Sequence, residues 1–197
     1  MLTKTPTIFY TPEDYRLFEE TAEFRNEYHD GEIIQMPGGT INHNRITVNV
    51  CSYLKFNLRG KNAVPFMIDL RLWIPQYRRG TYPDIMVIEG QAIFTEGRKD
   101  EVLNPLLIVE VLSDSTRSFD RNNKFRFYRS IPELRECILI EQNEFLVEQF
   151  VKTESGQWLF HEYEGDAATV SFPSVGVQML MSDIYEGVIF EESNDRE

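Results

Sequence analysis

The stretch Leu107-Ile108-Val109-Glu110-Val111-Leu112, read together with the earlier Tyr82-Pro83-Asp84-Ile85-Met86-Val87, decides the fold of this chain. The run from Pro105 to Leu112 is apolar on both faces, which predicts a central strand, and residues 82–88 predict a second strand. Each run contains one acid, Asp84 or Glu110. A carboxylate inside an apolar strand costs free energy unless it is paired or bound to a metal ion. The two acids are therefore the first candidates for a functional site.

Clear start and stop signals mark the elements before these strands. Thr11-Pro12-Glu13-Asp14 combines a cap residue, a proline and first-turn acids, which predicts a helix running to about Glu20. Asp30-Gly31 between two strand-like runs predicts a hairpin. Apolar residues at three- and four-residue steps predict a helix from about Asn42 to Leu58, ended by Gly60.

Strands dominate the rest of the pattern. The partial alternation from Val64 to Ile74 predicts one strand with a buried face, followed by a basic turn at 76–80. Beyond the central strand we expect a helix over Asp120–Ser130, another central strand at Ile138–Ile140, and antiparallel hairpins that end in a short helix near Met181. The order of elements predicts an α/β protein with a central mixed sheet.

Length and composition favour one soluble globular domain over residues 1–197. The chain is 42% hydrophobic and 13% aromatic, and its apolar runs are too short to span a bilayer. The N-terminus has no basic segment followed by an apolar one, so no secretory signal is visible. The two cysteines, Cys51 and Cys137, lack metal-type spacing and are interpreted as reduced thiols. These features predict a cytoplasmic protein.

The net charge of −12 is unevenly distributed. Residues 1–129 carry 17 acidic and 17 basic side chains, whereas residues 130–197 carry 15 acidic and 3 basic ones, and this difference of 12 accounts for the whole charge. Nucleic-acid binding draws on lysine and arginine, so a nucleic-acid surface would have to lie on the first part of the chain. A solvated acidic surface that keeps the protein soluble is the simpler alternative. The basic residues concerned are Arg117, Arg121, Lys124, Arg126 and Arg129.

Asp84, Glu110 and Lys124 together could hydrolyse a phosphodiester. If their strands are neighbours, the backbones lie about 4.8 Å apart. Two carboxylates at that spacing repel one another, and a hard divalent cation with oxygen ligands, such as magnesium, relieves the repulsion. Such an ion activates water and stabilises charge on the phosphate. Lys124, one helix further on, could reach over the strand end to orient the water or offset negative charge.

Structural interpretations of the same residues stay open. Lys124 and Asp120 are four residues apart and could form a surface pair. Asp84 could cap a strand end, and Glu110 could be bound by Arg71. His43 begins the long helix; a hydrogen bond to Glu27 is favoured over a chemical role for it.

A longer string of residues makes the sequence recognisable. Tyr82-Pro83-Asp84, Glu110 with the Ser113-Asp114-Ser115-Thr116 that follows, and then Asp120, Lys124 and Tyr128 resemble the Uma-two family of restriction-endonuclease-like proteins. Glu27-Tyr28-His29-Asp30-Gly31-Glu32 and His43 also look like that family. The resemblance runs from about Thr11 to Ile140. The family is grouped with the PD-(D/E)XK nucleases, whose core is a mixed sheet flanked by helices.

The resemblance implies a metal-dependent endonuclease and assigns a role to each site residue. Asp84, Glu110 and the main-chain carbonyl of Val111 would hold magnesium or manganese. The general nuclease pattern has a lysine two residues after the glutamate, but Leu112 stands there. In this family the lysine role is thought to have moved to the following helix, which here means Lys124.

Three expectations complete the interpretation. The substrate is expected to be DNA, bound beside the site by Arg117, Arg121, Arg126 and Arg129, with no membrane partner. The alternative is a module that keeps the nuclease fold for binding or assembly without catalysis. A homodimer is expected, because the C-terminal hairpins carry more large apolar side chains than a small edge sheet needs, and because cutting both strands of a duplex benefits from two-fold symmetry. These side chains are Phe145, Val147, Phe150, Trp158 and Phe160.

Overall fold

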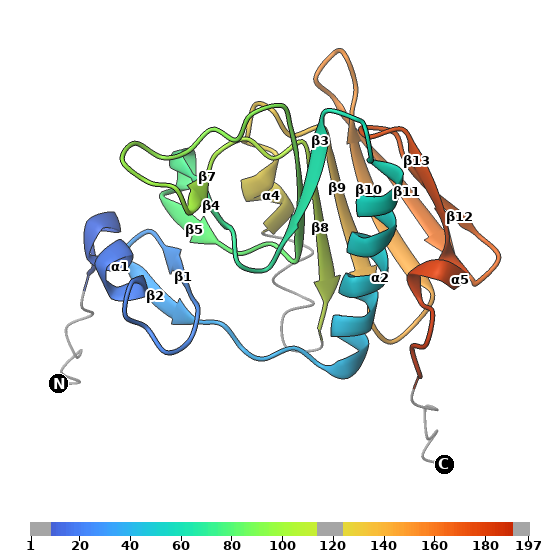
Figure 1. The fold of residues 1–197 in the computed structure, drawn as a ribbon, viewed down its shortest axis with the longest axis horizontal. Helices are drawn as coiled ribbons and strands as arrows, with labels where there is room; N and C mark the ends of the chain where they lie inside the picture. The colour runs from blue at the N-terminus through green and yellow to red at the C-terminus, as the bar shows by residue number, and fades with distance from the viewer. Residues whose placement is uncertain (1–8, 114–123, 191–197) are drawn as a thin grey trace, which may run out of the picture.

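A six-stranded mixed sheet forms the centre of the fold. The computed structural model describes residues 9–113 and 124–190. The strand order is β11-β10-β9-β8-β6-β3, in which β8 and β9 are parallel and the other neighbours are antiparallel (Figure 1). The predicted central strands are confirmed, because every residue of β8 and β9 is buried. The bounds are β3 Ala63–Met67, β6 Ile85–Glu89, β8 Leu107–Leu112, β9 Glu136–Glu141, β10 Leu146–Lys152 and β11 Trp158–Glu164.

Helices cover the two faces of this sheet. The long helix predicted from the sequence is α2 (Ile41–Asn57), which is capped by the Thr40 side chain and packs its buried face onto one side of β8. On the other side, Tyr128 of α4 (Phe125–Tyr128) lies in a cluster with Ile108 and Leu112. Successive residues of a strand face opposite sides, so the apolar character of β8 on both faces serves both helices. Of the helix predicted over 120–130, residues 120–123 lie outside the described part of the chain.

A second sheet, in the order β2-β1-β5-β4-β7, lies beside the first (Figure 1). Its first two strands form the predicted hairpin, with Asp30 (φ 43°) and Gly31 (φ 111°) in the left-handed region that such a turn requires. The predicted first helix is α1 (Pro12–Glu19), which has a capping box on Thr11 and packs Tyr15 against Tyr28. The strands are β1 Asn26–His29, β2 Glu32–Gln35, β4 Arg71–Ile74, β5 Arg79–Thr81 and β7 Glu101–Val102.

The single strand predicted over 64–74 is wrong. The extended conformation is interrupted at Ile68, which has a positive φ of 52°. As a result β3 belongs to the six-stranded sheet and β4 to the second one. The period-2 pattern continues across the break and therefore hides it. The basic turn predicted at 76–80 is also only partly correct, because a short 3-10 helix, η1 (Pro75–Tyr77), precedes Arg78 and β5 begins at Arg79.

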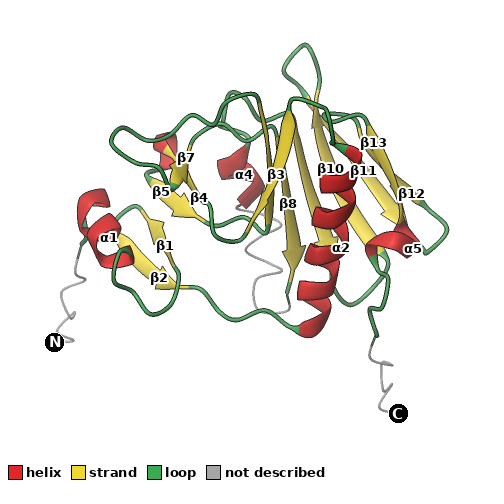
Figure 2. Cartoon of the chain, in the orientation of Figure 1, coloured by secondary structure: helices red, strands yellow, loops and turns green. Residues whose placement is uncertain are grey.

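The C-terminal part consists of the predicted hairpins and short helix. The hairpin of β10 and β11 extends the central sheet, and a separate hairpin joins β12 (Thr169–Phe172) to β13 (Val177–Leu180) (Figure 2). The chain then enters α5 (Met181–Ile184), which packs near α2. In the described ranges, every helix is too short or too polar to cross a membrane.

Candidate active site

Asp84 and Glu110 lie at the same end of two paired strands. In the antiparallel pair of β6 and β8, Ile85 is opposite Val109, so Asp84 comes opposite Glu110 at the next position. The backbone N–H of Val111 donates a hydrogen bond to Asp84 Oδ2 at 2.8 Å. The prediction that the two strands are neighbours agrees with this pairing, and the sharing of one ion by the two carboxylates stays a prediction.

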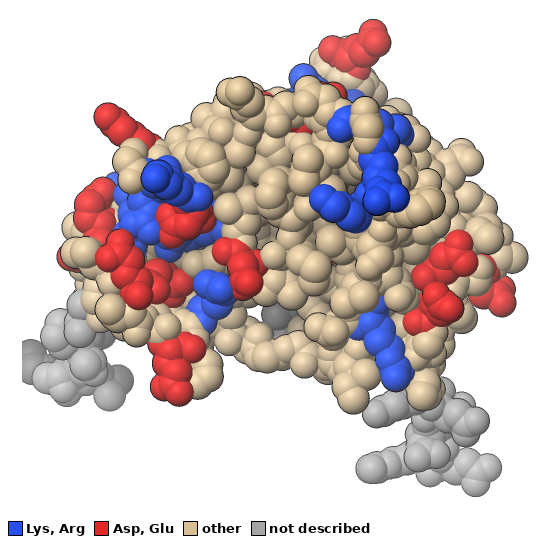
Figure 3. Space-filling view, in the orientation of Figure 1, with Lys and Arg blue, Asp and Glu red and all other residues tan. Residues whose placement is uncertain are grey.

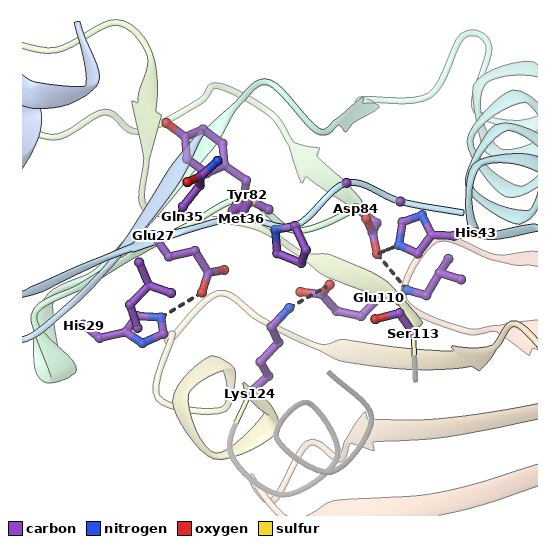
Figure 4. A pocket seen from close by; sticks show the side chains of 15 residues that line it. Glu27, His29, Gln35, Met36, His43, Tyr82, Asp84, Glu110, Ser113 and Lys124 are labelled. Carbon is purple, nitrogen blue, oxygen red and sulfur yellow. Dashed lines mark hydrogen bonds and ion pairs between the residues drawn. The ribbon is translucent and has the colours of Figure 1, made fainter. Parts of the chain in front are cut away.

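Both carboxylates line a cavity of about 330 Å³ between the two sheets (Figure 4). Lys124 and His43 enter it from α4 and α2, and Glu27 and His29 enter it from β1. Residues 34–39, at the end of β2 and in the connection to α2, form a less polar wall. Among the described residues, all those that line the cavity precede Ser130, so residues 130–190 contribute no carboxylate to it.

Glu110 is 3% exposed and is held at both of its oxygens. The hydroxyl of Tyr128 donates a hydrogen bond to Oε1, and Lys124 Nζ lies 3.3 Å from Oε2. Burial and the charge of Glu110 raise the pKa of Tyr128 well above its ordinary value, so the phenol stays a hydrogen-bond donor. Lys124 thus points toward the acids, as predicted. Its alternative partner, Asp120, lies outside the described residues.

Arg71 does not bind Glu110, which contradicts one structural alternative. Its guanidinium instead lies 3.0 Å from Glu101 and 2.9 Å from Asp100. Glu101 also accepts hydrogen bonds from Arg16 of α1. This buried ion-pair network ties α1 to β4 and β7, so it stabilises the second sheet and leaves Glu110 to the cavity.

His43 contacts Asp84 and not the expected Glu27. Its Nε2 lies 3.2 Å from Asp84 Oδ2, and its backbone N–H is capped by Thr40. The expectation was wrong because the first turn of α2 reaches the end of β6, whereas Glu27 lies across the cavity (Figure 4). A Cβ at Gly39 would come within 3.2 Å of the His43 ring, so a glycine there leaves room for the ring.

Glu27 and His29 belong to the site, although their hairpin motif gave no indication of a chemical role. Glu27 Oε2 lies 2.7 Å from His29 Nε2, and Thr81 of β5 donates a hydrogen bond to Oε1. Burial alone would raise the pKa of Glu27, but the His29 hydrogen bond, the charge of Lys124 and the Thr81 hydrogen bond lower it to about 2. An acid within a strand-like run was the available signal, the same signal that identified Asp84.

Side chains alone do not make a metal centre here. Among the residues that the structure describes, His, Cys, Asp and Glu form no group of three with the geometry of a metal site. The donor set at the strand ends is two carboxylates and nearby backbone oxygen. Oxygen donors of this kind suit magnesium or manganese better than zinc, which favours nitrogen and sulfur.

Comparisons with known proteins agree with the fold and with the resemblance. Residues 12–182 match the Uma2 family, described as "Putative restriction endonuclease". Two uncharacterized proteins of Synechocystis sp. are relatives. One is 40% identical over 172 residues, covering 87% of this chain and 97% of that protein, and the other is 31% identical over 182 residues, covering 91% and 93%.

A solved structure shares the fold. It is described as a putative nuclease belonging to DUF820 from Anabaena variabilis, and it superposes with a TM-score of 0.75 at 20% identity, covering 91% of this chain and 99% of that one. The α/β fold with a central mixed sheet is therefore the fold of that protein too.

Proposed function

This chain belongs to the Uma2 family of restriction-endonuclease-like proteins, and from that premise we propose that it hydrolyses phosphodiester bonds in DNA with a divalent cation held by Asp84 and Glu110. The observation that carries the proposal is that both carboxylates, next to the paired strands β6 and β8, line one cavity together with Lys124.

The residues present fit magnesium or manganese. Asp84 and Glu110 supply carboxylate oxygens at the wall of one cavity. Val111 supplies the third oxygen in this proposal. Its N–H is directed at Asp84, and in an extended strand the N–H and C=O of one residue point to the same edge. A bound ion would provide an activated water and would stabilise charge on the phosphate.

The neighbouring side chains have supporting roles in this proposal. Tyr128 fixes the orientation of the Glu110 carboxylate, and His43 fixes that of Asp84. The Lys124 ammonium, 3.3 Å from Glu110 Oε2, orients the attacking water or offsets charge on the phosphate. The general nuclease pattern places this lysine on the strand, but here it comes from the element that follows.

The nucleic-acid surface is proposed to lie on the first 130 residues. Arg126 and Arg129 are exposed next to Lys124, whereas Arg117 and Arg121 lie outside the described residues. A further basic group, formed by Lys55, Arg59 and Lys61, is exposed at the C-terminal end of α2 (Figure 3). A phosphate backbone avoids surfaces with uncompensated negative charge, and the acids of the described residues 130–190 do not line the cavity.

A homodimer is part of the proposal, although most of the apolar side chains first considered are used inside the protein. Val147 is buried, and Phe150 and Trp158 pack against Phe125. Of the side chains first considered, Phe160 is half-exposed, and it lies beside half-exposed Leu159 on the edge strand β11. An edge strand offers unpaired backbone groups to a second copy. Light scattering at micromolar concentration should give twice the 23.2 kDa mass, and the monomer mass would contradict the dimer.

The test of the function is cleavage of plasmid and single-stranded DNA with and without Mg²⁺. Asp84→Asn keeps the size of the side chain but removes its charge, and it should abolish cleavage. Asp69→Asn makes the same change on an exposed loop outside the cavity and should cut like the parent. Equal cleavage by parent and Asp84→Asn, or no metal-dependent cleavage by the parent, would favour a non-catalytic binding or assembly module with the same fold.

A further inference from the structure

We propose that Glu27 of β1 is a positioning residue, which keeps the Lys124 ammonium inside the cavity when a divalent cation occupies Glu110. The inference rests on the proposed function for the presence of that cation. It extends the site beyond the central sheet, because β1 belongs to the second sheet. It also gives the Glu27-Tyr28-His29 stretch a purpose that hairpin formation does not explain.

Glu27 is held rigidly at the wall of the cavity. Its side chain is 12% exposed, and its two oxygens are bound by different partners, His29 Nε2 at 2.7 Å and the Thr81 hydroxyl. β1 also pairs with β5, the strand that carries Thr81. This pairing fixes the backbone of Glu27 relative to the backbone of its partner Thr81. A buried carboxylate held in this way presents a stationary negative charge to the cavity.

Lys124 lies between two carboxylates. Figure 4 shows its amine between Glu110, to which it is paired at 3.3 Å, and Glu27 on the opposite side. Glu27 and Lys124 line the same cavity, and the charge of Lys124 is one of the causes that lower the pKa of Glu27. The ammonium can therefore be attracted by either acid without leaving the cavity.

Metal binding would change how strongly Glu110 attracts the Lys124 ammonium, but not how strongly Glu27 does. Glu110 Oε2, which pairs with Lys124, is also an oxygen of the proposed cation site. A divalent cation at Glu110 repels the ammonium, and a lysine side chain has a long flexible stem that lets it swing away. Glu27 lies outside the proposed ligand set, so it continues to attract the ammonium. Lys124 then stays in the cavity, beside the phosphate of the bound substrate.

The experiment measures where Lys124 is, independently of cleavage. Lysines are acetylated briefly at a fixed pH with and without saturating Mg²⁺, and modification is quantified for each peptide by mass spectrometry. Exposed Lys55 and Lys99 serve as internal references. In the parent, Lys124 should react slowly in both conditions. In Glu27→Gln, Mg²⁺ should accelerate acetylation of Lys124 at least fivefold while the reference lysines stay unchanged.

Two further variants separate charge from folding. Glu136→Gln makes the same change at another buried glutamate, which bonds to Gln149 and Ser174 away from the cavity, and it should behave like the parent. Glu27→Asp retains the negative charge, so Mg²⁺ should accelerate acetylation of its Lys124 less than twofold. This variant also tests the inference if Glu27→Gln folds poorly. For cleavage, Glu27→Gln should lower kcat with little change in KM for DNA.

The outcomes distinguish this inference from the proposed function. If the parent cleaves DNA but Lys124 of Glu27→Gln stays protected with Mg²⁺, or if Glu27→Asp releases Lys124 as Glu27→Gln does, the positioning role is wrong and the nuclease function stands. If Glu27→Gln releases Lys124 with Mg²⁺ but the parent does not cleave, the positioning role holds and the function is wrong. Absence of any Mg²⁺ effect in every variant overturns the inference.

Discussion

Removing the hydroxyl of Tyr128 should destabilise the protein, because the buried Glu110 carboxylate loses a hydrogen bond. Tyr128→Phe deletes one oxygen at a residue that is 1% exposed, and the lost hydrogen bond ends on a carboxylate that is 3% exposed. A hydrogen bond to a charged group contributes about 1.5–3 kcal/mol to stability. We therefore expect the free energy of unfolding to fall by about 2 kcal/mol. At about 2–4 °C for each kcal/mol in a protein of this size, Tm should fall by about 4–8 °C.

Urea denaturation followed by circular dichroism measures this change, with m values compared to check that the unfolded states are alike. Tyr53→Phe is the matched control, because its hydroxyl donates to the carbonyl of Gln178 at 2.8 Å in an exposed setting. A neutral hydrogen bond of that kind contributes about 0.5–1.5 kcal/mol. If Tyr128→Phe costs no more than Tyr53→Phe, the hydroxyl does not hold a charged Glu110, and the account of this carboxylate is wrong.

Three other predictions address the charges of the site. The pKa of Glu27 is lowered to about 2 from 4.5, so the stability that its charge contributes is fully present above about pH 4.5 and is lost as the pH falls toward 2. Glu27→Gln should therefore show a smaller drop in Tm between pH 5 and 2.5 than the parent. Equal drops in Tm would contradict this. Lys124→Ala should abolish cleavage. Because Lys124 is 14% exposed and paired with buried Glu110, the change should also lower the free energy of unfolding by more than the roughly 0.5 kcal/mol of a surface change. An unaltered urea midpoint would show that the pair is not formed. Arg126→Ala should reduce the slope of log DNA affinity against log salt by about one, and an unchanged slope would remove Arg126 from the nucleic-acid surface.

The elements predicted best from the sequence are those whose signals are local. The cap at Thr11 and the Asp30-Gly31 turn lie within a few residues of the structures that they start. The strand β8 and the centre of β9 at Ile138–Ile140 were recognisable because nearly every residue there is apolar. Asp84 and Glu110 stood out for the same reason, as acids in an apolar setting.

The errors concern features that depend on distant parts of the chain. The break at Ile68 places an isoleucine at a positive φ, which its side chain disfavours and which a hydrophobic pattern does not reveal. The partner of His43 depends on where the start of α2 meets β6, and the burial of Glu27 depends on Thr81 of another strand. Such pairings arise only once the sheets are assembled, so sequence spacing could not supply them.

The most direct test of the proposed site is an anomalous difference map from crystals soaked in Mn²⁺. The account predicts one strong peak between the carboxylates of Asp84 and Glu110, with the carbonyl of Val111 also coordinated and the Lys124 ammonium retained in the cavity next to Glu27. The absence of a peak at saturating Mn²⁺, or a peak that touches neither carboxylate, would contradict it.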